Sequence, residues 1–573
     1  MRKQRKMTAM ASTAVALSML LAACSGGGAA TEVGDSGKSA GAGEANGGTS
    51  NTAPATQENL DPLGKYDPPI TVRAVRRVDQ STKYKDGESV DNNVWTRAYE
   101  ELLGVKIAND WVVVGSGDQY NQKLNVSLAS GDLPDIFSVN AQQLKQLVEA
   151  GQIEDLTEVY EKYASDYTKQ VMTESGPNIL SSATFGGKLM AIPVAAGTID
   201  GLPLLWIRTD WLQKLNLPEP KTMDDVIAIA RAFATQDPDG NGKDDTIGMA
   251  ASKDLYGGFP GLDGFFNAYH AYPATGKMWI KDDSGQLVNG AIQPEVKTAL
   301  AKLQELYKEG ILDKEFGSKD GGKVAEAATS GKLGLYFGQM WTPIWPLQDG
   351  KNKDAAMDWK PFPIPSSDGQ PVKLQANFPV NDYWVVRKGY EHPEVMVKLQ
   401  NITLQKLWSP EADPALVDPI DGIEVHKYAI NEATPARKNI DNYLAAKEAL
   451  ETGDPSKLSK SMKEGLYDKI VAYRAGDNTA WAMEKVFGED SSFEIINDHY
   501  VSKSVTLDTA FYGAPTETMG AKMETLSRLE LETFTKIIMG AASVDEFDTF
   551  VENWKKLGGD QITKEVNEWA ANR

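Results

Sequence analysis

Patterns typical of strands and helices alternate through the first part of this chain, and this alternation restricts its possible folds most strongly. Residues 70–77 (ITVRAVRR) alternate in polarity as a strand does, and the next segment places Val94, Ala98 and Leu102 on one helical face before Gly104. A strand, a helix, a strand and a helix are then predicted at residues 105–114, 120–131, 134–139 and 141–151. This order predicts βαβ units, and therefore a mostly parallel sheet covered by helices.

The later part of the chain has a different pattern. Two extended runs follow Thr184, and a helix follows for which Thr222 is the predicted N-cap, with acidic residues in its first turn. Strands return near Gly331, and the chain from Pro393 onward is mostly helical. Roughly 500 residues are too many for one hydrophobic core, so two or three lobes are expected.

The N-terminus has the features of a lipoprotein signal. A basic start precedes an apolar stretch from Met7 to Ala23, and residues 21–24 (LAAC) match the lipobox in which the cysteine is acylated. Cys24 is the only cysteine in the chain, so neither a disulfide nor a cysteine-based metal site can form. We therefore expect residues 1–23 to be removed and Cys24 to anchor the protein by its acyl chains; an ordinary cleaved signal with an incidental cysteine is the alternative.

The segment from residue 24 to 64 is rich in Gly, Ser, Thr and Ala, and is expected to be a flexible tether. The formal net charge of the chain is -21. A surface this acidic repels phosphates, so nucleic acid is not an expected partner. The tether and the acidic, disulfide-free composition favour the outer face of a membrane, with a Gram-positive cell as the expected source.

Residues 237–245 (DPDGNGKDD) place four aspartates within nine positions, where like charges repel unless a cation lies among them. Side-chain oxygens stand at positions 1, 3, 5 and 9 of this segment, namely Asp237, Asp239, Asn241 and Asp245. Gly242 is at position 6 and the carbonyl of Lys243 at position 7, which is the spacing of an EF-hand-like calcium loop. The loop predicts a structural calcium ion, although position 12 is Gly248 instead of the usual glutamate. A solvated Asp-Pro-Asp-Gly turn is the alternative.

Several segments in the same order resemble one known family. They are residues 123–137 (KLNVSLASGDLPDIF), 186–212 (GGKLMAIPVAAGTIDGLPLLWIRTDWL), 237–248 (DPDGNGKDDTIG), 381–394 (NDYWVVRKGYEHPE) and the tail from Ala514. Together they resemble the large extracellular solute-binding lipoproteins of carbohydrate ABC importers. The resemblance covers nearly all of the chain after the tether.

The resemblance implies an α/β fold of the periplasmic-binding-protein type II, with two lobes joined by hinge strands and a helical C-terminal region. The first lobe would hold residues 65–190 with about 355–390, and the second lobe 191–354 with 391–573. A ligand cleft would lie between the lobes and close by hinge motion. Members of the family often complete the calcium site with positions 9 and 10 of the loop, which are Asp245 and Thr246 here.

Aromatic and polar side chains are the expected ligand contacts, because sugars stack on flat rings and bond to polar groups through their hydroxyls. The chain contains 13 tryptophans and 20 tyrosines, and many of them cluster where the resemblance places hinge and cleft. The candidates are Trp341, Trp345, Trp384, Tyr383, Asn381, Asp382 and Trp206. Trp341 is the first choice for a stacking platform. Each of these rings could instead belong to a core, where most large rings lie.

Two further candidates come from other arguments. Asn140 follows a predicted strand, at the carboxyl end where parallel sheets present ligand contacts. Arg208 either pairs with Asp210 or binds the carboxylate of an acidic sugar, and the sequence leaves both open.

The predicted function is capture of an oligosaccharide, or another carbohydrate, and its delivery to the membrane subunits of an ABC importer by a monomeric, lipid-anchored protein. The rivals are a membrane-anchored polysaccharide hydrolase or lyase, and a solute-sensing subunit of a signalling receptor. Four scattered histidines and the absence of HExxH, Walker A and GxGxxG motifs disfavour other enzyme classes. We therefore expect a binding protein without catalytic residues.

Overall fold

The computed structural model describes residues 61–417 and 423–573, and all of them belong to one compact unit. The predicted signal, Cys24 and nearly all of the predicted tether lie outside these ranges. No helix of the described ranges combines the length and apolarity that a membrane span needs.

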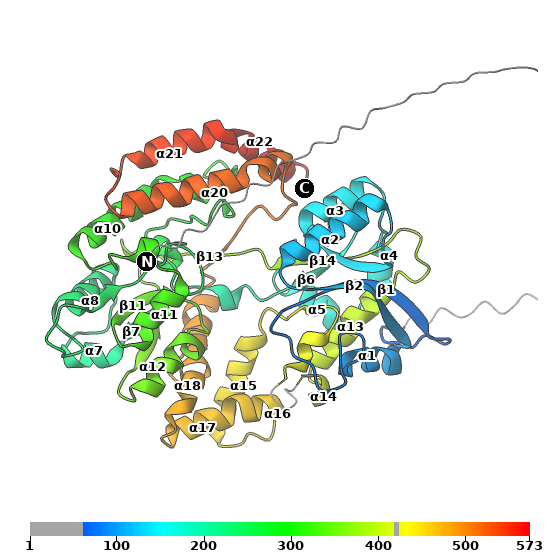
Figure 1. Ribbon diagram of the computed structural model, residues 1–573, viewed down its shortest axis with the longest axis horizontal. Helices are drawn as coiled ribbons and strands as arrows, with labels where there is room; N and C mark the ends of the chain where they lie inside the picture. The colour runs from blue at the N-terminus through cyan, green and yellow to red at the C-terminus, as the bar shows by residue number, and fades with distance from the viewer. Residues whose placement is uncertain (1–60, 418–422) are drawn as a thin grey trace, which may run out of the picture. The chain divides into compact units, whose positions relative to one another are not determined.

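A five-stranded sheet organises the first part of the chain, in the order β2-β1-β3-β14-β6 (Figure 1). Its strands are β1 (Ile70–Val78), β2 (Val105–Val114), β3 (Ile136–Val139), β6 (Ile192–Ala195) and β14 (Val380–Val386). The strands β1, β2 and β3 are parallel, as the βαβ pattern predicts. The strand β14 runs antiparallel to β3 and β6, so a segment from much later in the sequence lies between them in this sheet.

Helices cover this sheet and share one hydrophobic core with it. They are α1 (Val94–Ala98), α2 (Gly117–Ser130), α3 (Ala141–Glu149), α4 (Thr157–Tyr163), α5 (Asp166–Thr173), α6 (Asn178–Ser182), α13 (Val395–Trp408) and α14 (Pro414–Val417). Local chemistry sets their ends: Ser116 and Asn140 form capping boxes at the starts of α2 and α3, and Gly131 ends α2 in the left-handed conformation.

A four-stranded sheet, in the order β12-β7-β11-β8, organises a second core. Its strands are β7 (Leu204–Arg208), β8 (Ile247–Met249), β11 (Leu333–Gly338) and β12 (Trp359–Phe362). Three two-stranded pairs complete the strand inventory of the described residues: β4 (Thr184–Phe185) with β5 (Lys188–Leu189), β9 (Trp279–Lys281) with β10 (Leu287–Asn289), and β13 (Leu374–Ala376) with β15 (Thr506–Asp508).

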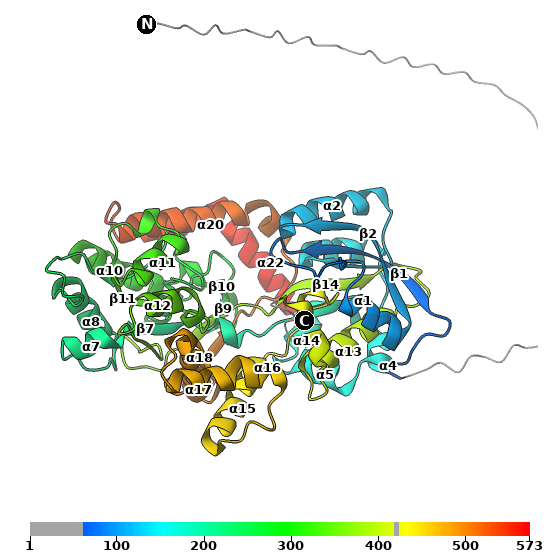
Figure 2. The same cartoon turned by 60° about the horizontal axis from the view of Figure 1, so that its bottom comes forward.

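The remaining helices belong to this second part of the chain (Figures 1 and 2). They are α7 (Thr209–Lys214), α8 (Met223–Thr235), α9 (Asp263–Ala268), α10 (Pro294–Glu309), α11 (Gly321–Thr329), α12 (Gln348–Lys353), α15 (Lys438–Thr452), α16 (Lys460–Met462), α17 (Asp468–Arg474), α18 (Trp481–Phe487), α19 (Ser492–Ile495), α20 (Glu517–Ile538), α21 (Glu546–Trp554) and α22 (Asp560–Ala571). Thr222 caps α8 as predicted, with Asp225 completing the capping box. The long helix α20 packs beside α10 and α21, and places its apolar stripe on the second core.

The chain passes between the two cores three times. At the first passage, buried side chains up to Ala195 belong to the first core and those from Leu202 to the second. At the second passage the chain returns, since Ala376 belongs to the second core and Val380 to the first. The third passage lies between Ile430 and Ile440. This arrangement gives the two-lobed α/β fold that the resemblance implies.

Candidate ligand-binding site

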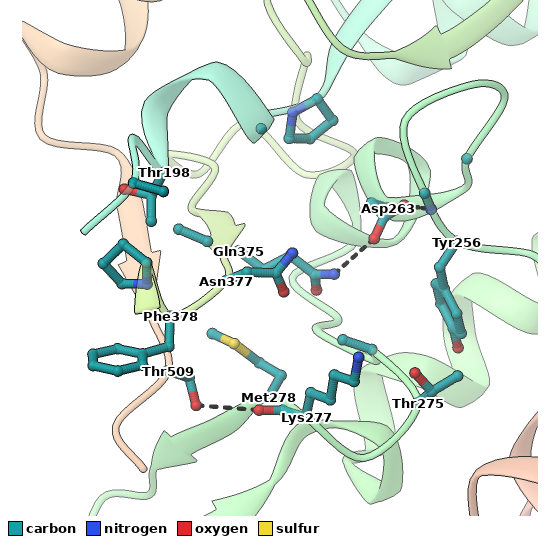
Figure 3. A pocket seen from close by; sticks show the side chains of 18 of the residues that line it. Thr198, Tyr256, Asp263, Thr275, Lys277, Met278, Gln375, Asn377, Phe378 and Thr509 are labelled. Atoms are coloured by element: carbon teal, nitrogen blue, oxygen red, sulfur yellow. Dashed lines mark hydrogen bonds between the residues drawn. The ribbon is translucent and has the colours of Figure 1, made fainter. Parts of the chain in front are cut away.

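A cavity of about 780 Å³ is lined by segments that come from both cores. Figure 3 shows part of this lining from close by. The first core contributes Ala141 at the start of α3 and Tyr383 on β14, and residues 196–198 form the first passage between the cores. The second core contributes the loop residues 254–264, the segment 274–278, the end of β11 and residues 509–515. Residues 375–379, which form the second passage, line it as well. The cavity therefore lies where the chain crosses from one core to the other.

Glycines allow the backbone to form much of the cavity wall. A Cβ atom at Gly261 would lie 2.3 Å from the carbonyl oxygen of Gly257, and one at Gly338 would lie 2.7 Å from the ring of Tyr336. No side chain fits at either position, because real Cβ atoms do not approach other atoms so closely. These glycines therefore allow the close packing of the segments that form the wall.

Asp263 holds one wall of the cavity together. It opens α9, and its carboxylate accepts hydrogen bonds from the backbone N–H of Gly257 (3.0 Å) and from Nε2 of Gln375 (2.9 Å). Desolvation raises the pKa of Asp263 to about 6, although these hydrogen bonds favour the charged form. The carboxylate joins the glycine-rich loop to β13 and so fixes the shape of this wall (Figure 3).

Tyr256 is positioned by a buried acid on a distant helix. Its hydroxyl donates to Oε1 of Glu530 on α20 (2.7 Å), and the backbone N–H of Thr275 donates to the same oxygen (3.1 Å). Glu530 is fully buried, and this desolvation raises its pKa to about 7. Both Tyr256 and Thr275 line the cavity, so Glu530 orients two lining residues without reaching the cavity itself.

Asp263, Tyr256 and Glu530 are not among the site residues predicted from the sequence. A signal for Glu530 was nevertheless present, because it stands in the apolar stripe of α20 between Leu526 and Phe534, at a spacing of four residues from each. A charged residue on the buried face of an amphipathic helix indicates a specific partner.

Trp341 and Trp345 lie on the segment that follows β11, and neither is among the residues that line the cavity. Their rings stack with centroids 6.3 Å apart and an interplanar angle of 22°. The indole N–H of Trp341 donates to Oε1 of Gln339 (2.8 Å), and Gln339 lines the cavity. Trp341 is half-buried and Trp345 is 45% exposed, so both rings have free surface. Their contact with a ligand stays a prediction.

The predicted residues of β14 divide between two cavities. Tyr383 lines the first cavity, whereas Asp382 and Trp384 line a second one of about 660 Å³ at the ends of β1 and β3. This division follows from the alternation of side chains along a strand. Asn381 lies on the same strand, and its role stays a prediction.

Three further predicted contact residues do not line the cavity. Trp206 is fully buried in the second core, so its ring has no surface for a sugar. Arg208 is 3% exposed, and its guanidinium donates two hydrogen bonds to Asp210 (2.8 and 2.6 Å), which corresponds to the internal pair among the two alternatives. The side chain of Asn140 accepts from the backbone N–H of Gln143 (2.9 Å) and caps α3; its neighbour Ala141 reaches the cavity instead.

The acidic loop folds with its side chains directed inward. The carboxylate of Asp237 accepts from the backbone N–H groups of Asn241 (3.0 Å) and Gly242 (2.9 Å), and the side-chain amide of Asn241 donates to Asp239 (2.8 Å) and Asp245 (3.0 Å). This convergence agrees with the predicted EF-hand-like spacing. The described residues nevertheless contain no group of three or more His, Cys, Asp or Glu side chains placed to hold a metal.

A lysine from another segment contacts this loop. Nζ of Lys332, just before β11, lies 2.7 Å from Oδ2 of Asp239 and 2.7 Å from Oδ1 of Asp245. These hydrogen bonds lower the pKa of Asp245 and raise the pKa of Lys332. Thr246, the other predicted ligand, donates its hydroxyl to the carbonyl of Phe233 (2.7 Å). The donor set is therefore a poor fit to calcium, and calcium binding stays a prediction.

Comparisons with known proteins agree with this architecture. The family model described as "Bacterial extracellular solute-binding protein" matches residues 82–399, which is more than half of the chain. The lipoprotein LipO of Bacillus subtilis (strain 168) is 26% identical over 497 residues, covering 83% of this chain and 88% of LipO. The polygalacturonan/rhamnogalacturonan-binding protein YtcQ of the same organism is 25% identical over 473 residues, covering 82% of this chain and 86% of YtcQ.

Solved structures share the fold at lower sequence identity. One is the S. pneumoniae ABC-transporter substrate-binding protein FusA, an EF-hand mutant in complex with fructo-nystose. It matches with a TM-score of 0.56 and 16% identity, and the match covers 88% of this chain and 100% of that chain. The two-lobed architecture is thus shared with solved solute-binding proteins.

Proposed function

The chain belongs to the bacterial extracellular solute-binding proteins, and on this premise we propose that it captures an oligosaccharide for an ABC importer. The observation that carries the proposal is the cavity at the passages between the two cores. Its volume of about 780 Å³ is within the range typical of small-molecule sites. Its lining includes aromatic and neutral polar side chains between glycines and other small residues, and this combination suits a ligand with C–H faces and many hydroxyls.

Binding would bring the two lobes together around the solute. We propose as the hinge the three passages at residues 195–202, 376–380 and 430–440, because each joins two rigid cores through a short segment. This proposal also moves the limits of the returning part of the first lobe. That part was expected at about 355–390, whereas buried side chains of the described residues from Val380 to Val417 and from Ile423 to Ile430 pack in the first core.

We further propose that Cys24 carries the lipid anchor, which would hold the protein at the outer face of the membrane beside the permease. The lobe surfaces would then present the loaded cavity to the transmembrane subunits. The family is described as solute-binding, and one relative is itself called a lipoprotein, which supports this proposal.

A ligand panel tests the proposal. The full mature chain is incubated with neutral and acidic oligosaccharides, thermal unfolding is recorded, and the retained ligand is recovered and analysed by chromatography. We expect at least one sugar to raise the melting temperature and to be recovered intact, with a decrease in the radius of gyration in X-ray scattering. Recovery of shortened products would contradict the proposal and would support the hydrolase instead.

A further inference from the structure

The described residues that line the cavity include few charged side chains. They are the carboxylates Asp254 and Asp263 and the ammonium group of Lys277, and there is no arginine among them. Lys277 is exposed and points into the cavity (Figure 3). One cation therefore faces two carboxylates in this cavity.

A polyuronate would meet unfavourable electrostatics in such a site. Each uronate unit carries a carboxylate, and a carboxylate removed from water needs a cation or several donors close to it, most often a bidentate arginine. Arg208, the candidate for that role, is buried in the second core and bonded to Asp210. Asp254 and Asp263 would in addition repel an anionic chain.

Neutral hydrogen-bonding groups are plentiful in the same wall. The polar lining side chains include Thr198, Thr275, Gln339, Asn377, Tyr383 and Tyr512. Amides and hydroxyls both donate and accept, as sugar hydroxyls do, so they pair with a neutral sugar without an unmatched charge. Phe378 and Phe511 add apolar faces for the C–H surfaces of a sugar ring.

The second cavity does not add a net positive charge. Its charged lining residues are Arg76, Arg77, Lys427, Asp79, Asp382 and Glu432. The guanidinium of Arg76 is already bonded to the carbonyls of Tyr428 (3.0 Å) and Ala429 (2.9 Å), so it is held as a structural contact. Three cations thus face three carboxylates, which gives an anionic ligand no excess of positive charge.

From this charge distribution we propose that the cavity takes neutral oligosaccharides and rejects polyuronates. The inference rests on the proposed function and makes its ligand class specific. The proposed ligand class also differs from that of YtcQ, whose name gives polygalacturonan as a ligand.

The test uses ligands that differ in the carboxylate alone. Isothermal titration calorimetry of the full mature chain compares trigalacturonate with its carboxyl-reduced form, together with neutral fructo-, gluco-, xylo- and galacto-oligosaccharides. We expect a neutral sugar to bind, and trigalacturonate to bind at least roughly 30-fold more weakly than the best neutral ligand, as for an unpaired charge in a binding site. The variant Asp254→Asn should reduce this difference, because it removes one repelling carboxylate from an exposed position.

Two other outcomes would contradict the inference, and they differ in what they imply for the proposed function. Tighter binding of trigalacturonate than of its reduced form would overturn the inference and leave the proposed function standing. If no sugar of either class binds, the proposed function fails and the inference fails with it.

A second inference concerns the acidic loop and comes from independent contacts. The ammonium group of Lys332 lies between Asp239 and Asp245, the two carboxylates at positions 3 and 9 of the loop. A cation at this place neutralises the charges that a bound calcium ion would otherwise neutralise.

Two other predicted ligands of this loop, Asn241 and Thr246, are engaged in other hydrogen bonds. The side chain of Asn241 donates its N–H groups to the same two carboxylates, and the hydroxyl of Thr246 donates to Phe233. Position 12 cannot hold a glutamate, because a Cβ at Gly248 would lie 2.2 Å from the carbonyl oxygen of Ala230. Lys332 also joins the loop to the second sheet, since its carbonyl accepts from the backbone N–H of Ile247 (2.8 Å).

We infer that Lys332 is the internal cation of this loop and that the chain folds without calcium. Thermal unfolding and calorimetry with calcium chloride, after removal of metal with EDTA, test this inference on the full mature chain. We expect no saturable calcium binding up to ~1 mM, the weak limit for extracellular calcium sites, and the same melting temperature in EDTA and in calcium.

Two substitutions complete the test. Lys332→Met should lower the melting temperature, whereas Lys323→Met, which removes an exposed lysine paired with Glu326 within α11, should leave it almost unchanged. Lys332→Arg, which keeps the charge, is the substitute if the methionine variant does not fold. Calcium binding by the wild-type chain, a lower melting temperature in EDTA, or equal stability of the two methionine variants would each overturn the inference.

Discussion

The buried carboxyl group of Glu530 predicts a stability that falls as the pH rises. In the folded protein its pKa is about 7, whereas an ordinary glutamate in the unfolded chain titrates near 4.5. Between these two values the folded state holds a proton that the unfolded state has lost. Stability is therefore highest below the unfolded pKa and decreases as the pH rises towards the folded pKa.

The linkage relation gives the size of this effect. For these two pKa values the loss of unfolding free energy between pH 5 and pH 8 is about 2–3 kcal/mol. The side chain of Glu530 is fully buried, so solvent does not screen this effect. Glu530→Gln removes the titration, and the glutamine carbonyl can still accept from Tyr256 and Thr275.

Chemical unfolding at pH 5, 6, 7 and 8 measures the effect. The stability of Glu530→Gln relative to the wild type should rise by about 2–3 kcal/mol across this range, since the groups that both proteins share, such as Asp263, cancel in the difference. Glu524→Gln, an exposed position on the same helix, should show no such trend. A difference between Glu530→Gln and the wild type that does not vary with pH would refute the reasoning.

Three further predictions concern the ligand, the core and the anchor. Trp341→Ala should weaken oligosaccharide binding by roughly 30-fold in calorimetry, as for an aromatic anchor, while Trp111→Ala on β2 should not; equal effects would contradict a stacking role. Arg208→Ala should cost about 3–5 kcal/mol in chemical unfolding, because it leaves the carboxylate of Asp210 without its partner, and should not alter affinity in the folded variant. Cys24→Ser should move the protein from the membrane fraction to the medium on immunoblots of fractionated cells; retention in the membrane fraction would argue against the lipid anchor.

Local patterns in the sequence were sufficient for the elements of the fold. The strand at Val105–Val114 and the helix cap at Thr222 are as predicted, because strand alternation and capping depend on residues only a few positions apart. The break between α21 and α22 at Gly558 also follows from local chemistry, since its φ of 139° suits glycine. The two-lobed fold, in contrast, was expected from the family resemblance.

The binding site was less predictable. The sequence does not distinguish the three candidate tryptophans Trp206, Trp341 and Trp384. In the structure Trp206 lies in a core, Trp341 is half-buried, and Trp384 lines the second cavity. Which face of a ring stays free depends on the elements that pack against it, and those elements come from other parts of the chain.

The sequence alone determined the strand and helix alternation, the match to a lipobox and the spacing of the acidic loop, because each depends on residues within one short segment. Only the tertiary structure decided what lies opposite those segments. Lys332 meets Asp239 across 93 residues, and Tyr256 meets Glu530 across 274 residues. Charge pairing and desolvation depend on distances in space, and the folding of two cores sets those distances.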